Sequence, residues 1–356
     1  MVRNKNKKVY GALLLAPLFL WTSSLVWAQD RKALEKIIEG AKSEGRVKAG
    51  GTVRWLEGGK PGAKKMVEVF QARYPFVKVE YERVGGFRER EKVLSEMAGG
   101  NISYDTATLS ETQVRTALEA KVVEMVDWRS LGVHPQHVHP DGFGVNYRSQ
   151  VYGIAYNRKL VPDKVGTKLT WDDCASPKWK GKVAMDVRPR HMEVLWQPHV
   201  WGREKTLAHA RQVSANQAIF ERSRDQAMQK LNLGEYPVLC GPLFFTYYDQ
   251  LRSGRSKDIG FVLVEPIPVT LGDVVFIARG SKHKNAAKLW IVWSLSDEGQ
   301  AVLDEVEGSG SPVFPGTQAA KMIKGKKVAF YETKWRAKSD EILKEIIEAV
   351  GLPVVQ

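Results

Sequence analysis

The sequence predicts an α/β protein that folds into two lobes. The chain has 356 residues, which is long for one small domain and suits two domains of ordinary size. Segments with the two-residue alternation of strands and segments with helical spacing follow one another along it. This pattern occurs twice, on either side of a loop-like stretch at 129–150 that contains several prolines and glycines. Two such patterns in one chain indicate two α/β lobes.

The first pattern begins with an amphipathic segment. Apolar residues at helical spacing predict a leading helix at 31–48, which Gly50 and Gly51 end. Strands are then expected at 52–56, 77–81 and 105–109, alternating with helices at 63–73, 87–98 and 111–120. The order strand, helix, strand is typical of a parallel sheet with crossover helices.

The second pattern occupies about 160–265, after a clear strand at 151–156. A further strand at 273–278 follows Pro266 and Pro268. The remaining elements are strands at 182–187, 236–240 and 259–264 and helices at 203–213, 223–232, 285–303 and 339–349. Two such lobes suggest a clamshell, because ligands of open α/β sheets bind beyond the carboxyl ends of the strands.

The N-terminus has the layout of a secretory signal peptide. Residues 1–8 are basic, an uncharged run follows at 9–28, and Val26 and Ala28 occupy the small-residue positions before a cleavage site. We therefore predict a Sec signal peptide at 1–28, cleaved after Ala28, and a periplasmic mature protein. An uncleaved membrane anchor is the alternative, since an uncharged run of 20 residues is long enough to span a bilayer. Pro17 argues against a continuous spanning helix.

The charge of the chain narrows the range of partners. The net charge is +14, and removing residues 1–28 takes away four positive charges and leaves +10. Export argues against nucleic acid as a partner. The remaining charge is compatible with an anionic ligand, or with a generally basic surface.

The two cysteines, Cys174 and Cys240, lie in apolar surroundings and are interpreted as buried small hydrophobic residues. A disulfide between them stays open as an alternative in an oxidising periplasm. No nucleophile elbow, zinc-protease helix, phosphate loop or dinucleotide fingerprint occurs in the sequence. The prediction is therefore a protein that is not an enzyme and needs no cofactor.

Seven short segments form a recognisable series along the chain. They include VYGIAYNRKLV at 151–161, TWDD at 170–173 and SPKWKGKV at 176–183, and the others lie at 70–75, 77–79, 234–238 and 285–300. Each segment is weak alone, but their order and spacing are specific and cover almost the whole mature chain. The series resembles the bacterial extracellular solute-binding proteins of the ferric-iron-binding-protein-like group.

The resemblance implies a type II periplasmic-binding fold, in which two lobes with mixed or parallel sheets are joined by two hinge strands. It places the hinges near 150–157 and 264–272. Lobe 1 would comprise 29–152 and 270–325, lobe 2 would comprise 153–269, and a C-terminal helical segment at 326–356 would pack on the lobes. It also implies a monomeric substrate-binding subunit of an ABC-type uptake transporter, which closes on its solute and delivers it to a membrane permease.

The iron-binding members of the group hold ferric ion with an adjacent tyrosine pair, a histidine and an acidic residue. Here Tyr247 and Tyr248 form such a pair, and Glu111 lies near the acidic position. The pair comes about three residues late, however, and Phe244 and Phe245 occupy the expected position. The loop that supplies the histidine reads Glu57, Gly58, Gly59. Iron therefore remains an alternative rather than the leading prediction.

A small anionic solute, such as a phosphonate or a carboxylate, is the leading prediction. Backbone N–H groups at Gly58 and Gly59 and at Ser110 could point at an anion from lobe 1. The lobe 2 candidates are Arg188, Arg190, Arg222 and Ser223. Each arginine could instead be a solvated surface charge. A third possibility is a membrane-tethered sensor module on the same fold, which retention of residues 1–28 would favour.

One histidine cluster invites a metal interpretation. His134, His137 and His139 lie close together in the loop-like stretch at 129–150. No carboxylate or cysteine completes the set nearby except Asp141, so we interpret it as a polar surface loop.

Overall fold

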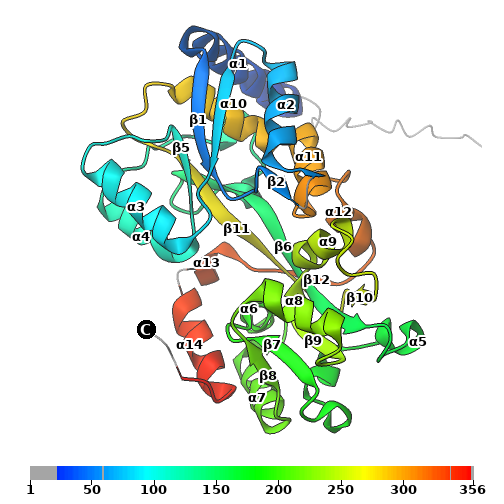
Figure 1. The fold of residues 1–356 in the computed structure, drawn as a ribbon. Helices are drawn as coiled ribbons and strands as arrows, with labels where there is room; N and C mark the ends of the chain where they lie inside the picture. Colours follow the sequence, from blue (N-terminus) through cyan, green and yellow to red (C-terminus); the bar gives the residue numbers. More distant parts are fainter. Residues whose placement is uncertain (1–21, 58–59, 337, 354–356) are drawn as a thin grey trace, which may run out of the picture.

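Two lobes lie one above the other in Figure 1, with the long strands β6 (Gly144–Asn157) and β11 (Ile267–Ile277) running between them. The computed structural model describes residues 22–57, 60–336 and 338–353. The predicted α/β fold class, two lobes joined by two strands, is confirmed.

Lobe 1 is built on a mixed sheet. β1 (Arg46–Gly51) pairs in parallel with β4 (Lys78–Arg83) and β5 (Thr106–Leu109), and β11 pairs antiparallel to β5. The helices of this lobe are α1 (Thr22–Glu44), α2 (Ala63–Arg73), α3 (Phe87–Ala98), α4 (Glu111–Glu119), α10 (Lys284–Ser294) and α11 (Asp297–Glu307), and a small hairpin is formed by β2 (Leu56–Glu57) and β3 (Lys60–Pro61).

Both faces of the lobe 1 sheet are covered. Val275 and Ile277 of β11 pack into the core beneath α1, α2, α10 and α11. Val274 and Phe276 alternate with them and pack into a second core beneath α3 and α4. Alternate residues of a strand point to opposite faces, so one apolar strand serves two cores.

Lobe 2 repeats the architecture on a smaller scale. β7 (Val183–Asp186) pairs in parallel with β8 (Ile219–Glu221) and β9 (Val238–Leu243), while β10 (Ile259–Val262) pairs antiparallel to β6. Its helices are α5 (Asp163–Gly166), α6 (Arg190–Leu195), α7 (Gly202–Ala215), α8 (Arg224–Leu233) and α9 (Phe244–Arg252). Short 3-10 helices lie at Arg129–Leu131 and Pro135–His137 in lobe 1 and at Trp171–Ala175 and Pro177–Trp179 in lobe 2.

The hinge consists of the two long strands. The first half of β6 pairs with β11, and its second half pairs with β9 and β10, so β6 passes from the sheet of lobe 1 into that of lobe 2. The predicted strand at 151–156 is therefore only the second half of a longer one. The residue limits assigned to the lobes stay a prediction.

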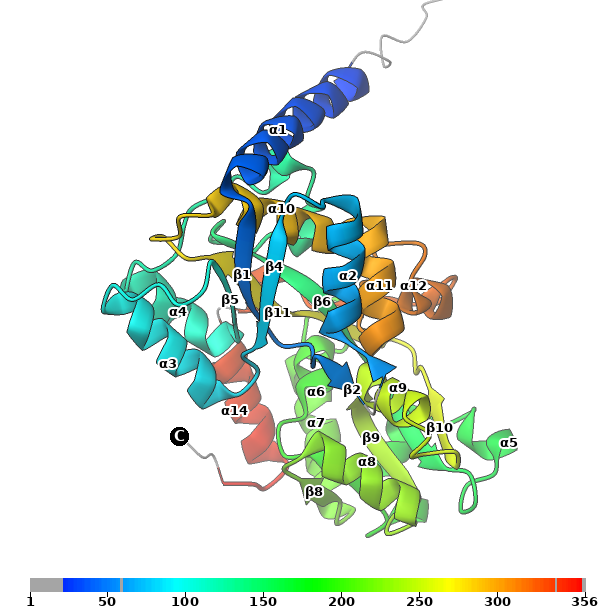
Figure 2. The same cartoon turned by 45° about the horizontal axis from the view of Figure 1, so that its top comes forward.

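The C-terminal segment runs along the hinge and then onto lobe 2. α12 (Gln318–Ile323) is followed by β12 (Val328–Phe330), which pairs in parallel with β11. α13 (Thr333–Arg336) leads to α14 (Ser339–Ala349), which packs against α6 and α7 (Figure 2).

The N-terminal elements differ from the prediction. The leading helix ends at Glu44 instead of 48, because Gly45 adopts a left-handed φ of +69°. The first strand accordingly lies at 46–51, where Val47 and Ala49 are buried, and not at 52–56. The predicted cleavage point after Ala28 falls within α1, and residues 1–21 of the predicted signal peptide lie outside the described residues. No helix in the described part of the chain is long and apolar enough to span a bilayer.

The helix predicted at 285–303 is two helices. The Ser296 hydroxyl accepts a hydrogen bond from the Gly299 backbone N–H at 3.2 Å and so starts α11 as a separate helix. Trp290 and Trp293 of α10 contact Phe70 edge-on, with ring centroids 5.0 and 5.4 Å apart. These aromatic rings form much of the lobe 1 core.

Cys174 and Cys240 form a disulfide, with their Cα atoms 6.1 Å apart. Both are buried in the lobe 2 core, as the apolar context predicts, but they are bonded rather than free. The reason is tertiary, because the 3-10 helix at Trp171–Ala175 packs directly against β9.

Candidate functional site

Two adjoining pockets lie between the lobes. Pocket A has a volume of about 210 Å³ and pocket B of about 400 Å³. Both are lined by Gly85, Arg90 and Asp273, so they meet at the point where α3 approaches β11. Sites of this size suit small organic molecules.

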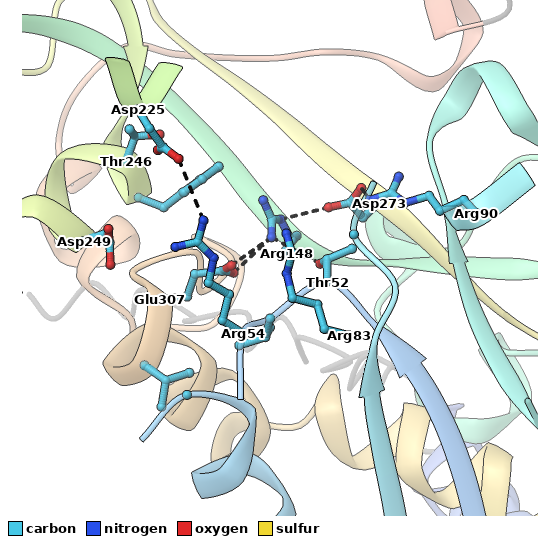
Figure 3. A pocket seen from close by; sticks show the side chains of 15 residues that line it. Thr52, Arg54, Arg83, Arg90, Arg148, Asp225, Thr246, Asp249, Asp273 and Glu307 are labelled. Atoms are coloured by element: carbon cyan, nitrogen blue, oxygen red, sulfur yellow. Dashed lines mark hydrogen bonds and ion pairs between the residues drawn. The ribbon is translucent and has the colours of Figure 1, made fainter. Parts of the chain in front are cut away.

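Pocket A is walled by both lobes (Figure 3). Lobe 1 supplies the ends of β1 and β4 and of α11, and lobe 2 supplies the starts of α8 and α9. The charged lining residues are Arg54, Arg83, Arg90, Arg148, Asp225, Asp249, Asp273 and Glu307. Among the described residues that line the pocket, positive and negative side chains are equal in number.

Arg148 of β6 is the centre of pocket A, and its side chain is only 8% exposed. Its Nε lies 3.1 Å from Asp273 Oδ2, and its Nη1 donates to Glu307 Oε1 at 3.0 Å. Burial alone would lower the pKa of Arg148, but the carboxylates of Glu307 and Asp273 raise it above its ordinary value. The ring of Phe245 from lobe 2 covers the guanidinium at 4.6 Å.

Asp273 neutralises a second arginine. Its Oδ1 accepts a hydrogen bond from Arg90 Nη2 at 3.1 Å. Asp273 has a left-handed φ of +54°, which directs its carboxylate between Arg90 and Arg148. The four side chains Arg90, Asp273, Arg148 and Glu307 therefore form one neutral chain of charges along the hinge.

Pocket B is more positive. Among the described residues that line it are five arginines and two carboxylates, namely Arg90, Arg188, Arg190, Arg224, Arg336, Glu193 and Asp273. Ser110, Gln150, Thr270 and Ser339 add polar groups. Tyr331, Arg336 and Ser339 come from the C-terminal segment, which therefore forms part of the wall.

A buried carboxylate anchors one side of pocket B. Glu193 accepts hydrogen bonds from Arg190 Nη1 at 3.2 Å and from the Ser339 hydroxyl at 2.7 Å. Burial raises the pKa of Glu193, although the charge of Arg190 opposes this effect. Arg224 is compensated separately, since its Nε donates to Asp186 Oδ2 at 3.3 Å.

The structure brings together part of the predicted site. Ser110, Arg188 and Arg190 all line pocket B. Ser223 lines a neighbouring pocket, which adjoins pocket B at Arg224 and pocket A at Thr246. Arg222 is exposed and lines none of these three pockets.

Three predicted residues follow the first strand, and one opens α4. Glu57 lies in β2 and Glu111 begins α4, but the structure describes only the backbone of each. Gly58 and Gly59 lie outside the described residues. Their predicted roles stay predictions.

Tyr247 and Tyr248 line neither pocket A nor pocket B, and their role as iron ligands stays a prediction. The Tyr247 ring stacks on Phe261 at 5.2 Å, and the Tyr248 hydroxyl donates to the Glu305 backbone carbonyl at 3.4 Å. Phe245, in the position expected for a tyrosine, faces pocket A instead. In the described part of the chain, no group of three or more His, Cys, Asp or Glu side chains is placed to hold a metal ion.

The loop that carries the histidine cluster lies only partly on the surface, where His134 is exposed. His137 and His139 are buried, and the two ring nitrogens of His137 contact the Asn146 carbonyl and the Ser311 hydroxyl. Burial lowers the pKa of His137 to about 4. The ring therefore ties the loop to β6 as a neutral hydrogen-bonding group.

Sequence reasoning missed Arg54, Arg83, Arg148 and Asp273. Arg83 ends β4, and Arg54 follows β1 closely. Both could have been predicted as site residues, because ligands of α/β sheets bind at the carboxyl ends of parallel strands. Arg148 and Asp273 carried no such signal, because both lie within the long antiparallel hinge strands.

Comparison with known proteins places the chain among transport receptors. Residues 109–335 match the family described as bacterial extracellular solute-binding protein. No curated protein sequence matches the chain.

Solved structures share its fold. Iron-bound HitA from Pseudomonas aeruginosa is 15% identical with a TM-score of 0.65, and the match covers 86% of this chain and 99% of HitA. The apo ferric ion-binding protein A of Pasteurella haemolytica is 17% identical with a TM-score of 0.65, over 88% and 100% of the two chains. The spermidine/putrescine substrate-binding protein PotD of Streptococcus pneumoniae is 15% identical with a TM-score of 0.61, over 86% and 99%.

Proposed function

This chain belongs to the bacterial extracellular solute-binding protein family, and on that basis we propose that it captures a small anionic solute between its lobes. It then delivers the solute to the membrane permease of an ABC-type uptake transporter from the periplasm. The fold and the family support the transport role. The charge of pocket B supports the anionic class of the solute.

The surplus of arginine in pocket B is the observation that carries this proposal. Arg190 is compensated by Glu193, Arg224 by Asp186 and Arg90 by Asp273. Arg188 lines the same pocket, is exposed, and has no hydrogen bond or ion pair from its side chain to any described residue. The charge of Arg188 acts on Glu193, where it opposes the rise in pKa, but no described carboxylate lies within ion-pair distance of its guanidinium. Such a guanidinium is suited to forked hydrogen bonds with a carboxylate or phosphonate.

Capture follows from the position of the pocket. In the open state, solvent fills the cleft and Arg188 is hydrated. Closure about β6 and β11 would bring Ser110 of lobe 1 and Arg188 of lobe 2 onto the same solute. The desolvated interaction with the anion then stabilises the closed state, which is the form that a permease would recognise.

A thermal-shift screen of the purified protein tests the proposal. The panel contains methylphosphonate, propionate, dicarboxylates, ferric citrate, spermidine and a neutral sugar. An anion at a hundredfold excess over its Kd should stabilise the protein by about 2.7 kcal/mol. Arg188→Ala should lower its affinity about tenfold, whereas the exposed control Arg211→Ala on α7 should leave it unchanged.

Other outcomes have equally definite meanings. A shift with spermidine or the sugar and with no anion would overturn the anionic class. A shift with ferric citrate that persists in Arg188→Ala and is lost in Tyr247→Phe would favour the iron alternative.

A further inference from the structure

We infer that the solute carries two separate anionic groups, one bound by Arg83 of lobe 1 and the other by Arg188 of lobe 2. This inference rests on the proposed function and narrows its solute class to dianions, such as dicarboxylates and phosphonocarboxylates. The observations that support it are the placement of the two arginines, the absence of ion pairs between their side chains and the described residues, and the neutral bridge between them.

Arg83 is a second arginine of the cleft whose side chain forms no ion pair with a described residue, although its charge contributes to lowering the pKa of Glu89. It ends β4, lines pocket A and is exposed, and its side chain has no hydrogen bond or ion pair to any described residue. Figure 3 shows its side chain directed into the pocket beside those of Arg54 and Arg148. Guanidinium groups repel one another, so an anion placed among them would relieve this repulsion.

The two arginines beside Arg83 in pocket A are each paired with carboxylates. Arg148 is already held by Asp273 and Glu307, both within 3.1 Å. Arg54 lies 3.9 Å from Asp225 across the cleft. Asp249 is engaged by Arg255 at 2.8 Å, so Arg83 is the arginine in the lining of pocket A whose side chain forms no ion pair with a described residue.

Arg188 is the corresponding group in pocket B. Its backbone N–H donates to Asp186 Oδ1 at 2.8 Å, which fixes the turn between β7 and α6. This contact holds the backbone and leaves the side chain available. Arg190, two residues later, is engaged by Glu193.

A neutral bridge separates the two sites. The Arg90–Asp273 pair, at 3.1 Å, lines both pockets, whereas Arg83 lines only pocket A and Arg188 only pocket B. A single compact anion would therefore engage one arginine and leave the other unpaired. A solute with an anionic group at each end would engage both.

This arrangement explains how solute binding would be coupled to closure. Arg83 moves with lobe 1 and Arg188 with lobe 2, so a dianion would add a charged contact with lobe 1 to the Ser110 contact that a monoanion can make. A dianion would then bind more tightly than a monoanion and would also increase the population of the closed state.

Isothermal titration of the full protein with matched probe pairs tests this inference. The pairs are propionate with the dicarboxylates from malonate to adipate, and methylphosphonate with phosphonoacetate and 3-phosphonopropionate. We expect at least one probe with two anionic groups to bind at least tenfold more tightly than its partner with a single anionic group, with an optimum at one chain length.

Two variants assign the groups. Arg83→Ala should reduce dianion affinity to the level of the monoanion while leaving monoanion affinity within about twofold. Arg188→Ala should weaken both. Arg129→Ala in lobe 1 and Arg211→Ala in lobe 2, both at exposed positions outside the pockets, should change neither.

The outcomes separate this inference from the proposed function. If monoanions and dianions bind equally, or if Arg83→Ala leaves dianion affinity unchanged, the two-site inference is wrong and anion capture stands. If no anion in the series binds to the wild-type protein, both fail.

Discussion

At the scale of single residues, the buried imidazole of His191 should make the stability of the protein depend on pH. It is 1% exposed, stacks on Trp171 at 5.0 Å, and neither ring nitrogen has a hydrogen-bond partner among the described residues. Gly241 makes this packing possible, because a Cβ there would come within 2.1 Å of His191 Nδ1. Burial, with a smaller contribution from His209, lowers the pKa of His191 to about 3.

Acid should therefore destabilise the protein. In the unfolded chain His191 takes up a proton near pH 6.5, whereas the folded state resists protonation until about pH 3. The stability that the neutral form of His191 contributes is fully present above about pH 6.5. It is lost as the pH falls from there towards 3, at about 1.4 kcal/mol per pH unit. Urea unfolding at pH 7, 6, 5 and 4 measures the slope, and His191→Phe should make it shallower by about that amount.

The matched control for His191 is His199, whose side chain is 52% exposed. His199→Phe should leave the slope unchanged. An identical slope in His191→Phe and in the wild type would contradict the prediction. Two other buried histidines, His137 and His209, have pKa values lowered to about 4 and will keep part of the dependence in every variant.

At the scale of elements, the disulfide and the hinge strands hold lobe 2 together. Cys174 lies in the 3-10 helix at Trp171–Ala175 and Cys240 in β9, 66 residues apart in sequence. The bond thus fixes a segment that has little regular structure of its own against the lobe 2 sheet. Both sulfurs are buried, so reduction also requires local opening.

Removing the disulfide should cost considerable stability. Closing a loop of this length is expected to stabilise the folded state by about 4 kcal/mol through the entropy of the unfolded chain. Cys174→Ala combined with Cys240→Ala should lower the free energy of unfolding by roughly that amount. Denaturant unfolding with and without dithiothreitol measures it. Dithiothreitol should destabilise the wild type and not the double variant, and an insensitive wild type would refute the expectation.

At the scale of the whole molecule, Arg252 joins the two lobes beside pocket A. This residue ends α9 in lobe 2, and its guanidinium donates to the Pro61 carbonyl at 2.8 Å and the Val306 carbonyl at 2.6 Å in lobe 1. Arg252 lines neither pocket A nor pocket B. Its contacts therefore act on the lobe arrangement and not directly on a solute.

Loss of these contacts should favour the open form. Two charge-assisted hydrogen bonds contribute about 1–3 kcal/mol, so Arg252→Ala should weaken anion affinity about tenfold without touching the anion. Small-angle scattering should show a larger radius of gyration for the solute-free variant than for the wild type. Unchanged scattering and unchanged affinity together would show that Arg252 does not hold the lobes closed.

Much of the fold could be predicted because it depends on local patterns. The helices at 63–73 and 87–98 were predicted with the bounds that the structure has, since their apolar faces repeat at helical spacing and glycine or proline limits them. The resemblance supplied the two-lobed arrangement. The first strand was misplaced because Thr52 to Leu56 also reads as a strand, while the true strand contains two glycines.

The sequence by itself determined the fold class, the family resemblance and the two arginines that follow β7, because these depend on periodicity and on the order of segments. Only the tertiary structure decided that Cys174 meets Cys240, that Arg148 and Asp273 neutralise each other in the hinge, and that the side chains of Arg83 and Arg188 form no ion pair with any described residue. The physical reason is distance along the chain. Cys174 and Cys240 are 66 positions apart and Arg90 and Asp273 are 183 positions apart, so only the folding of the whole chain decides that they meet.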